Sequence, residues 1–396
     1  MNILKCVNGV RVGTLAVSLV VGASVGCGVE KVEELEQTKG ALGSTKPQQT
    51  IGNWTQLTQM VSDGNYLVTA NLVSNGQPWV IKDFTGTFDG GGKTISNLTI
   101  NSPTAMGGFF GTISNAIVRN VRFINLTVNG QSFLGGVAGY SVDSLIQSVG
   151  VEGNINGSNA IATGGLLGEM NGGQVLQSYM KGSVNGSIMF TGGITGFIGP
   201  TEAAAGEIYQ CYAWATVTAD TSVSNRLVYT GGIAGLNTGS RIQEVYAVGN
   251  VTGRGYVGGL VGTLGCDGSH YYVINHGLYR GDVVDKNWSA SGGWSGTFGT
   301  YDPNCIGRFD QLIWDKSMDG SSNVGVQGDA QKSALDGDMM TPTTVSGGVY
   351  NYADNKFPTA IWTAGSASQH HALQSMPGGL TIQPRCVNSS GVPYAC

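Results

Sequence analysis

A glycine-rich motif that recurs at nearly constant steps constrains the fold of this chain more than any other feature. The motif is Gly-Gly-apolar-X-Gly, and its copies begin at Gly107, Gly135, Gly164, Gly192, Gly231, Gly258 and Gly292. Successive starts lie 28, 29, 28, 39, 27 and 34 residues apart, so the basic unit has 27–29 residues and two units carry insertions. Self-similarity at a period of about 20–50 residues is the signature of a stacked repeat architecture.

Between the copies of this motif, the chain alternates apolar and polar residues. Examples are the segments Val175–Val184 and Ile242–Val251, in which Gly or Asn interrupts the alternation where the chain must turn. The alternation predicts short β-strands, and no part of the repeat region has the 3.6-residue apolar period of a helix. Such units bury a face only when stacked, with glycine at corners of positive φ or where neighbouring coils approach closely.

These patterns predict an all-β fold, namely a right-handed parallel β-helix (β-solenoid) of about seven to eight coils with N- and C-terminal caps. The right-handed winding is expected because parallel crossover connections are nearly always right-handed. A β-propeller is excluded because each blade needs about 40–45 residues. We place the N-terminal cap at residues 51–83, the solenoid at 84–306, and the C-terminal cap with a disulfide-closed tail at 307–396.

The repeats resemble a known family. The copy Gly258–Gly262, the opening segment Phe84–Leu98 and the closing segments around Trp314 and Trp362 are similar to the GLUG-motif repeats of bacterial surface proteins. The resemblance covers residues 51–377 and implies a β-solenoid in an adhesin-like protein. Similar repeats form the non-catalytic part of immunoglobulin A-cleaving metallopeptidases, whose zinc-binding His-Glu-X-X-His motif is absent from this sequence.

The N-terminus has the order of residues found in a bacterial export signal. Residues 1–26 carry two basic residues and no acidic one, and an apolar stretch precedes Ser24-Val25-Gly26-Cys27, which resembles the lipobox of lipoproteins. We therefore expect Cys27 to be acylated and residues 27–50 to form a flexible tether. Gly28, where Asp would favour the inner membrane, favours the outer membrane and the cell surface. An ordinary signal peptide, in which Cys27 is incidental, is the alternative.

Five cysteines lie beyond the signal and the anchor. In an oxidising compartment they can pair, and the candidate disulfides join Cys266 to Cys305 and Cys386 to Cys396. Cys211 would be left over, and because sister repeats have Ser or Val at its position we expect a small buried hydrophobic residue there. No Cys/His spacing suggests a zinc site.

The charge balance narrows the range of partners. Without residues 1–26, 20 − 2 = 18 basic residues stand against 25 acidic ones, which gives a net charge of −7. A mildly acidic chain without a basic run argues against nucleic acid as a partner. For the same reason, attachment to a membrane should come from the N-terminal lipid alone.

The sequence offers more candidate residues for binding than for catalysis. Insertions in repeat proteins map to loops on one face, which is often the contact face. The insertions and their surroundings carry the binding candidates Arg226, Tyr229, Tyr271, Tyr272, Lys286 and Trp288. Exposed Tyr and Trp can stack on sugars or anchor a protein partner, although ordinary loop packing is the alternative for each. We predict a non-enzymatic adhesin or binding module for a glycan, a neighbouring cell or another envelope component such as a surface protein.

Residues that could carry chemistry are few, and we assign no catalytic residue, metal or cofactor. One acidic group near the C-terminal repeats could line the groove of a β-helical polysaccharide lyase or hydrolase, with Lys286 and Arg308 beside it. Its members are Asp282, Asp285, Asp310 and Asp315. Asp also favours turns, which is the simpler interpretation. A structural spacer within a surface assembly is a third alternative.

Overall fold

The protein is described here by a computed structural model, which covers residues 42–103, 106–186, 188–202, 204–219, 228–265 and shorter segments beyond them. Those segments are 272–280, 283–285, 294–301, 308–314, 339–340, 386–387 and 393–394. All of these residues belong to one compact unit, Ala41–Cys396. Within them the fold is all-β apart from one short helix, α2 (Trp54–Thr58), and this confirms the predicted fold class at that level.

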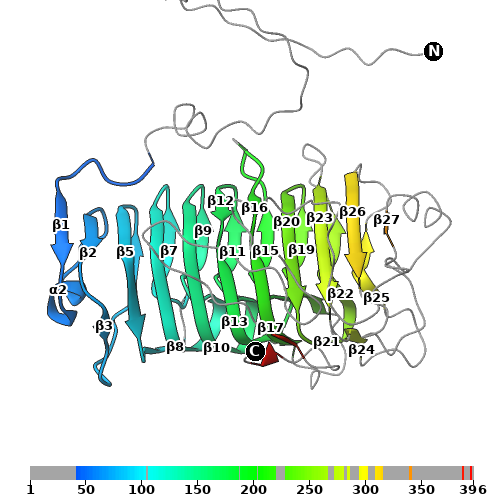
Figure 1. The fold of residues 1–396 in the computed structure, drawn as a ribbon, viewed down its shortest axis with the longest axis horizontal. Helices are drawn as coiled ribbons and strands as arrows, with labels where there is room; N and C mark the ends of the chain where they lie inside the picture. The colour runs from blue at the N-terminus through cyan, green and yellow to red at the C-terminus, as the bar shows by residue number, and fades with distance from the viewer. Residues whose placement is uncertain are drawn as a thin grey trace, which may run out of the picture. The chain divides into compact units, whose positions relative to one another are not determined.

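Most strands stack in rows, in which a strand pairs in parallel with the strand one repeat later (Figure 1). The first row contains β1 (Gln48–Ile51), β2 (Asn65–Val68), β3 (Leu72–Val73), β5 (Thr87–Ser96), β8 (Ile117–Leu134), β10 (Leu145–Gly164), β12 (Gln174–Leu176), β13 (Tyr179–Gly186), β16 (Glu207–Tyr209), β17 (Tyr212–Ala219), β20 (Arg241–Val248), β23 (Val273–Arg280), β26 (Arg308–Trp314) and β27 (Met339–Met340). The second row contains β4 (Lys82–Phe84), β7 (Phe110–Ser114), β9 (Ala138–Val142), β11 (Leu167–Asn171), β15 (Thr195–Gly199), β19 (Ala234–Thr238), β22 (Gly255–Gly265) and β25 (Trp294–Tyr301).

Two further rows share residues with the longest strands. The third row joins β6 (Thr99–Ser102), β21 (Val251–Gly253) and β24 (Val283–Asp285) through later residues of β8, β10, β13 and β17. The fourth row joins β14 (Phe190–Gly192) and β18 (Val228–Gly231) to the end of β10 and the start of β22. A separate antiparallel pair is formed by β28 (Cys386–Val387) and β29 (Pro393–Tyr394).

The chain turns within the first row at residues of positive φ that recur in successive repeats. They have φ between 48° and 55° and are Asn120, Ser148, Gln177, Gln210 and Glu244. The chain bends at the Gly-Gly motifs, for example at Gly165 between β10 and β11, but none of their described glycines has a positive φ. They lie where repeats approach closely, as the alternative predicted: a Cβ added at Gly164 would come within 2.6 Å of the Cα of Thr195.

One hydrophobic core runs between the rows. Its N-terminal part is aromatic, and the rings of Phe84 and Phe110 stack with their centroids 4.6 Å apart. Cys211 is fully buried in this core as a free thiol, and burial raises its pKa to about 12. This confirms the prediction that Cys211 acts as a small buried hydrophobic residue.

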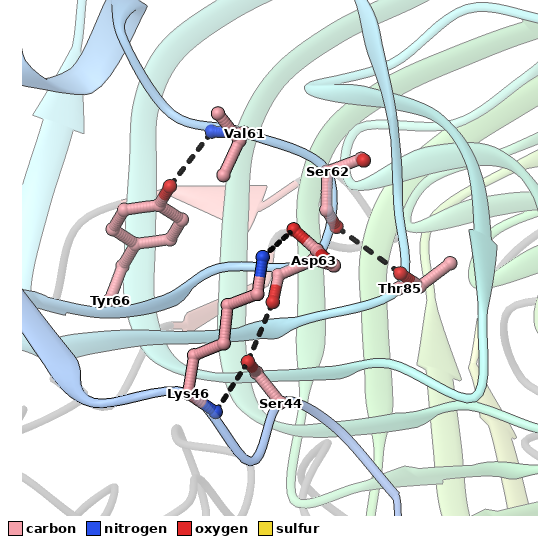
Figure 2. Close-up of polar contacts among 7 residues, drawn as sticks. All are labelled: Ser44, Lys46, Val61, Ser62, Asp63, Tyr66 and Thr85. Carbon is pink, nitrogen blue, oxygen red and sulfur yellow. Dashed lines mark hydrogen bonds and ion pairs between the residues drawn. The ribbon is translucent and has the colours of Figure 1, made fainter.

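The first strands are tied to the incoming chain by polar contacts (Figure 2). Ser44 Oγ donates a hydrogen bond to the carbonyl of Asp63 at 2.6 Å, and the Lys46 ammonium forms a 2.6 Å ion pair with the carboxylate of Asp63. The hydrogen bond from Lys46 lowers the pKa of Asp63. Beside them, the Tyr66 hydroxyl accepts the backbone N–H of Val61 at 2.8 Å. These contacts set the direction in which the chain enters β1.

The N-terminal end of the stack is covered by α2 and by tryptophan. Asn53 caps the helix by accepting a backbone N–H of its first turn at 2.9 Å. Trp79 stacks on Phe109 with a centroid distance of 4.5 Å and donates its indole N–H to the carbonyl of Phe109 at 2.7 Å. The segment 51–83, expected as a cap, thus contains the helix together with strands that already belong to the rows.

Candidate binding surface

One column of aromatic side chains lies on the outward side of the fourth row. Phe190 on β14, Tyr229 on β18 and Tyr256 on β22 pair in register. Phe133 at the end of β8 holds the same position two repeats before Phe190, with Ala162 between them. The four rings are partly exposed, whereas the residue that follows each ring in the chain is buried. The rings therefore face outward.

A second column flanks the first on the neighbouring row. Tyr140 on β9 lies edge-on to Phe133 with centroids 6.0 Å apart, and Phe197 on β15 lies 5.5 Å from Phe190. Both residues are partly exposed. We call the two columns together the aromatic strip, which consists of Phe133, Tyr140, Phe190, Phe197, Tyr229 and Tyr256.

The rings of the aromatic strip differ in what they offer to a ligand. Tyr229 and Tyr256 stack at 5.0 Å with 18° between their planes, so each covers a face of the other and their edges are left for contact. Phe190 is tilted by 34° from Tyr229 and by 46° from Phe197. Tilted rings present apolar faces, whereas the stacked tyrosines add polar edges, and the two together form an amphipathic surface.

A polar group lies within the strip. Glu169 on β11 stands in register between Tyr140 and Phe197. Asn171 donates hydrogen bonds of 2.8 Å to the hydroxyl of Tyr140 and to Oε1 of Glu169. Burial raises the pKa of Glu169, and the hydrogen bond from Asn171 opposes that shift. Burial also raises the pKa of the Tyr229 hydroxyl, which is therefore neutral at physiological pH.

This arrangement suits binding. It combines ring surface with hydroxyl, amide and carboxyl groups that donate and accept hydrogen bonds. Within the described part of the chain, no three His, Cys, Asp or Glu side chains come together as they would to hold a metal ion. Among the same residues, no helix is long and apolar enough to cross a membrane.

The structure gives the predicted binding residues different environments. Tyr229 belongs to the aromatic strip, as described above. Tyr272 is only 2% exposed and is part of the hydrophobic core, so its prediction as a surface contact is wrong. The reason is that Tyr272 directly precedes β23, where the chain has already returned from the insertion to the stack. The other candidates lie outside the described residues and are Arg226, Tyr271, Lys286 and Trp288.

The remaining predicted sites lie at or beyond the limits of the described residues. Asp285 and Asp310 are placed as backbone in β24 and β26, while Asp282 and Asp315 lie outside the described residues. Cys386 is placed as backbone in β28. The other cysteines of the predicted anchor and disulfides, which also lie outside, are Cys27, Cys266, Cys305 and Cys396. The acidic group, the anchor and the disulfides thus stay predictions.

Most of the aromatic strip was missed by sequence reasoning, although a signal for it exists. The first column consists of the residues two positions before four of the seven Gly-Gly motifs, and the other three copies have Ala there. These four residues are Phe133, Phe190, Tyr229 and Tyr256. The residue directly after the last Gly of the motif is aromatic in only two of the seven copies, at Tyr140 and Phe197. Aligning the copies on their glycines, and not on the insertions, would have found the first column but not the second.

The fold has counterparts among solved structures. The crystal structure of "a putative immunoglobulin A1 protease from Bacteroides ovatus" is similar over 84% of this chain and 94% of that chain, with a TM-score of 0.52 and 18% identity. A structure named "IgA1 Protease" matches 67% of this chain and 21% of its own length, with a TM-score of 0.47 and 19% identity. At such identities the likeness concerns the fold alone. No protein family and no curated protein matches the sequence.

Proposed function

We propose that this protein is a non-enzymatic binding module for a glycan, and that the aromatic strip is its contact surface. The observation that carries the proposal is the outward column Phe190–Tyr229–Tyr256, flanked by Phe197, on a row of parallel strands. Partly exposed aromatic rings beside polar groups suit the C–H faces and hydroxyl groups of a sugar. Aromatic residues are also the side chains most enriched at binding hot spots.

The proposal includes the setting of this surface. The rows are turns of a right-handed parallel β-helix with GLUG-type repeats, because strands one repeat apart pair in parallel and such crossovers favour that hand. The lipobox-like segment ending at Cys27 supports an exported lipoprotein, anchored in the outer membrane and displayed at the cell surface. A surface-displayed module of this kind attaches its cell to a glycan or to a neighbouring cell.

The first test measures retention of the purified full chain on a panel of bacterial and host polysaccharides, with immunoglobulin A added as a protein ligand. We expect the chain to be retained on at least one polysaccharide and to release no new sugar ends. The double substitution of Tyr229 and Tyr256 by Ala removes two anchors. If each contributes about 2 kcal/mol, Kd should rise by about thirtyfold for each.

A matched control is the substitution Tyr209→Ala. Tyr209 is also partly exposed, but it lies on β16 in the first row and bonds Glu244. The Tyr209→Ala substitution should leave the retention of the protein on the polysaccharide unchanged. Equal loss in both variants, or unchanged retention in the double variant, would reject the aromatic strip as the contact surface. Release of sugar ends would reject the non-enzymatic role, and retention only on immunoglobulin A would replace the glycan by a protein ligand.

A further inference from the structure

A second outward face carries a regular array of neutral hydrogen-bonding side chains. This array, on the third row, consists of the first and third residues of the segments 99–101, 127–129, 154–156, 183–185 and 216–218. The parallel register aligns these segments in two columns, each containing only Thr, Asn and Ser. The middle residues are Ile or Val, and all are at most 1% exposed. The flanking side chains of the array therefore face outward.

Hydrogen bonds hold one column in a fixed geometry. Asn185 donates to Asn156 at 2.9 Å, Asn156 donates to Asn129 at 2.9 Å, and Asn129 donates to Asn101 at 3.0 Å. A side-chain amide has two N–H donors and two acceptor lone pairs. Each inner Asn thus uses one donor and one acceptor within the ladder and keeps one of each for an outside partner. The orientation of these free groups is set before any ligand arrives.

The array is periodic in two directions. Neighbouring strands place the columns' members about 4.8 Å apart along the stack, and the step from the first to the third residue of a segment is about 6.7 Å. The array contains no charged residue. A neutral and doubly periodic surface matches a crystal plane better than it matches a single flexible chain.

The chemistry of the array favours water as its partner. A hydrogen bond to a carbohydrate replaces one to water, so its net contribution is small, about 1 kcal/mol, and no aromatic ring of the array adds to it. Water held by the array keeps its hydrogen bonds when it joins a lattice of water. In ice, hydrogen-bonded oxygen atoms lie about 2.75 Å apart and each oxygen has tetrahedral neighbours. Two oxygen atoms bonded to the same third one therefore lie about 4.5 Å apart, which is close to the spacing of neighbouring strands.

We propose that this face orders water in an ice-like layer and binds the surface of ice. The proposal does not rest on glycan binding, because it uses a different row and different side chains from the aromatic strip. It is compatible with the proposed display outside the cell.

The test compares the purified full chain with a variant in which Asn154 and Asn156 are both replaced by Lys. Asn154 is exposed and Asn156 is half-buried, and together they form the middle of the array. Two long charged side chains there should prevent the ice surface from approaching. We expect the unsubstituted chain to shape ice crystals and to produce a gap between the melting and freezing temperatures, and the variant to lose both effects.

Two controls separate the possible explanations. Gln147→Lys places one Lys on the same strand, β10, but on the first row at a half-buried position, and should keep full ice activity. The Tyr229/Tyr256 double variant should also keep it. Thermal unfolding of each variant verifies that it is folded. Absence of ice shaping by the unsubstituted chain, or activity that survives in the folded Asn154/Asn156 variant, overturns the proposal. Loss of polysaccharide retention in that variant, without ice activity in the parent, assigns the array to carbohydrate instead.

Discussion

In the repeated motif, glycine is needed because it has no Cβ atom. At Gly164 an added Cβ would overlap the carbonyl oxygen of Leu167 and would lie 2.6 Å from the Cα of Thr195 in the next repeat. Both are backbone atoms, which cannot move without shifting a whole strand. By contrast, positive φ at the recurring turn of the first row is supplied by Asn120, Ser148, Gln177, Gln210 and Glu244. Asn is among the residues that adopt this conformation most readily.

This difference predicts unequal effects of alanine. Gly164→Ala should lower the free energy of unfolding by about 3 kcal/mol, because it overpacks a contact between two backbones. Gly52→Ala serves as the control, since its Cβ would meet nothing closer than 3.4 Å and its φ is ordinary. It should change stability by less than about 0.5 kcal/mol. Urea unfolding of both variants measures the two values, and equal losses would contradict the close-approach role of the motif.

Neighbouring strands are also joined by polar groups on their outer sides. The carboxylate of Glu152 on β10 accepts hydrogen bonds of 2.7 Å from Arg122 on β8 and from Tyr179 on β13. The ammonium of Lys181 lies 3.7 Å from the same carboxylate. Burial alone would raise the pKa of Glu152, but these hydrogen bonds and charges outweigh burial and lower it. Three successive repeats are thereby linked through one ionised group.

A lowered carboxyl pKa makes this link dependent on pH. Its contribution is fully present above the pKa of an unfolded Glu and is lost as the pH falls through the lower pKa of the folded state. Glu152→Gln should therefore reduce the free energy of unfolding by about 1–3 kcal/mol at pH 7. The difference from the unsubstituted chain should shrink below about pH 4.5. Chemical unfolding at several pH values measures it.

Glu169→Gln provides the opposite case. Because burial raises the pKa of Glu169, the folded state favours its neutral form. Replacement by neutral Gln should stabilise the protein near pH 7, and this gain should disappear on acidification. A parallel pH response of the two variants would show that the hydrogen bonds of Glu152 do not outweigh its burial.

At the scale of the whole molecule, strands pair with strands of the adjacent repeat, so stability is close to a sum over neighbours. A repeat can then be removed without loss of the fold. Deleting residues 143–171 removes 171 − 143 + 1 = 29 residues and keeps the register, because Val142 and Asn171 occupy the same position in adjacent repeats. Ala162 is lost with the repeat, which makes Phe133 the neighbour of Phe190.

We expect the shortened protein to fold with a lower melting temperature, as circular dichroism would show. It keeps all six rings of the aromatic strip but lacks Glu169 and Asn171, so the binding assay should show weakened but not abolished retention on the polysaccharide. Deleting only residues 143–156 removes half of a repeat, so the strands that follow would face the wrong row of the preceding repeat. That control should not fold. A shortened protein that aggregates, although its register is intact, would show that cooperation extends beyond neighbouring repeats.

The sequence by itself determined the parallel all-β architecture. The spacing of the Gly-Gly motifs measures one repeat directly, because a close contact between backbones must recur at the same place in every repeat. Alternation of apolar and polar residues identified the strands for a similar reason, since each strand has one buried and one outward side. The burial of Cys211 followed from comparing the same position in sister repeats.

The tertiary structure alone decided which side chains share a surface. Phe190 and Tyr229 are separated by an insertion and become neighbours only because the strands on either side of it return to one register. The same return brings Tyr272, predicted to be a surface contact, into the core. Local pattern shows that a side chain points outward, but the stacking of distant strands decides what lies beside it. For this reason Tyr229 alone of the aromatic strip was predicted from the sequence.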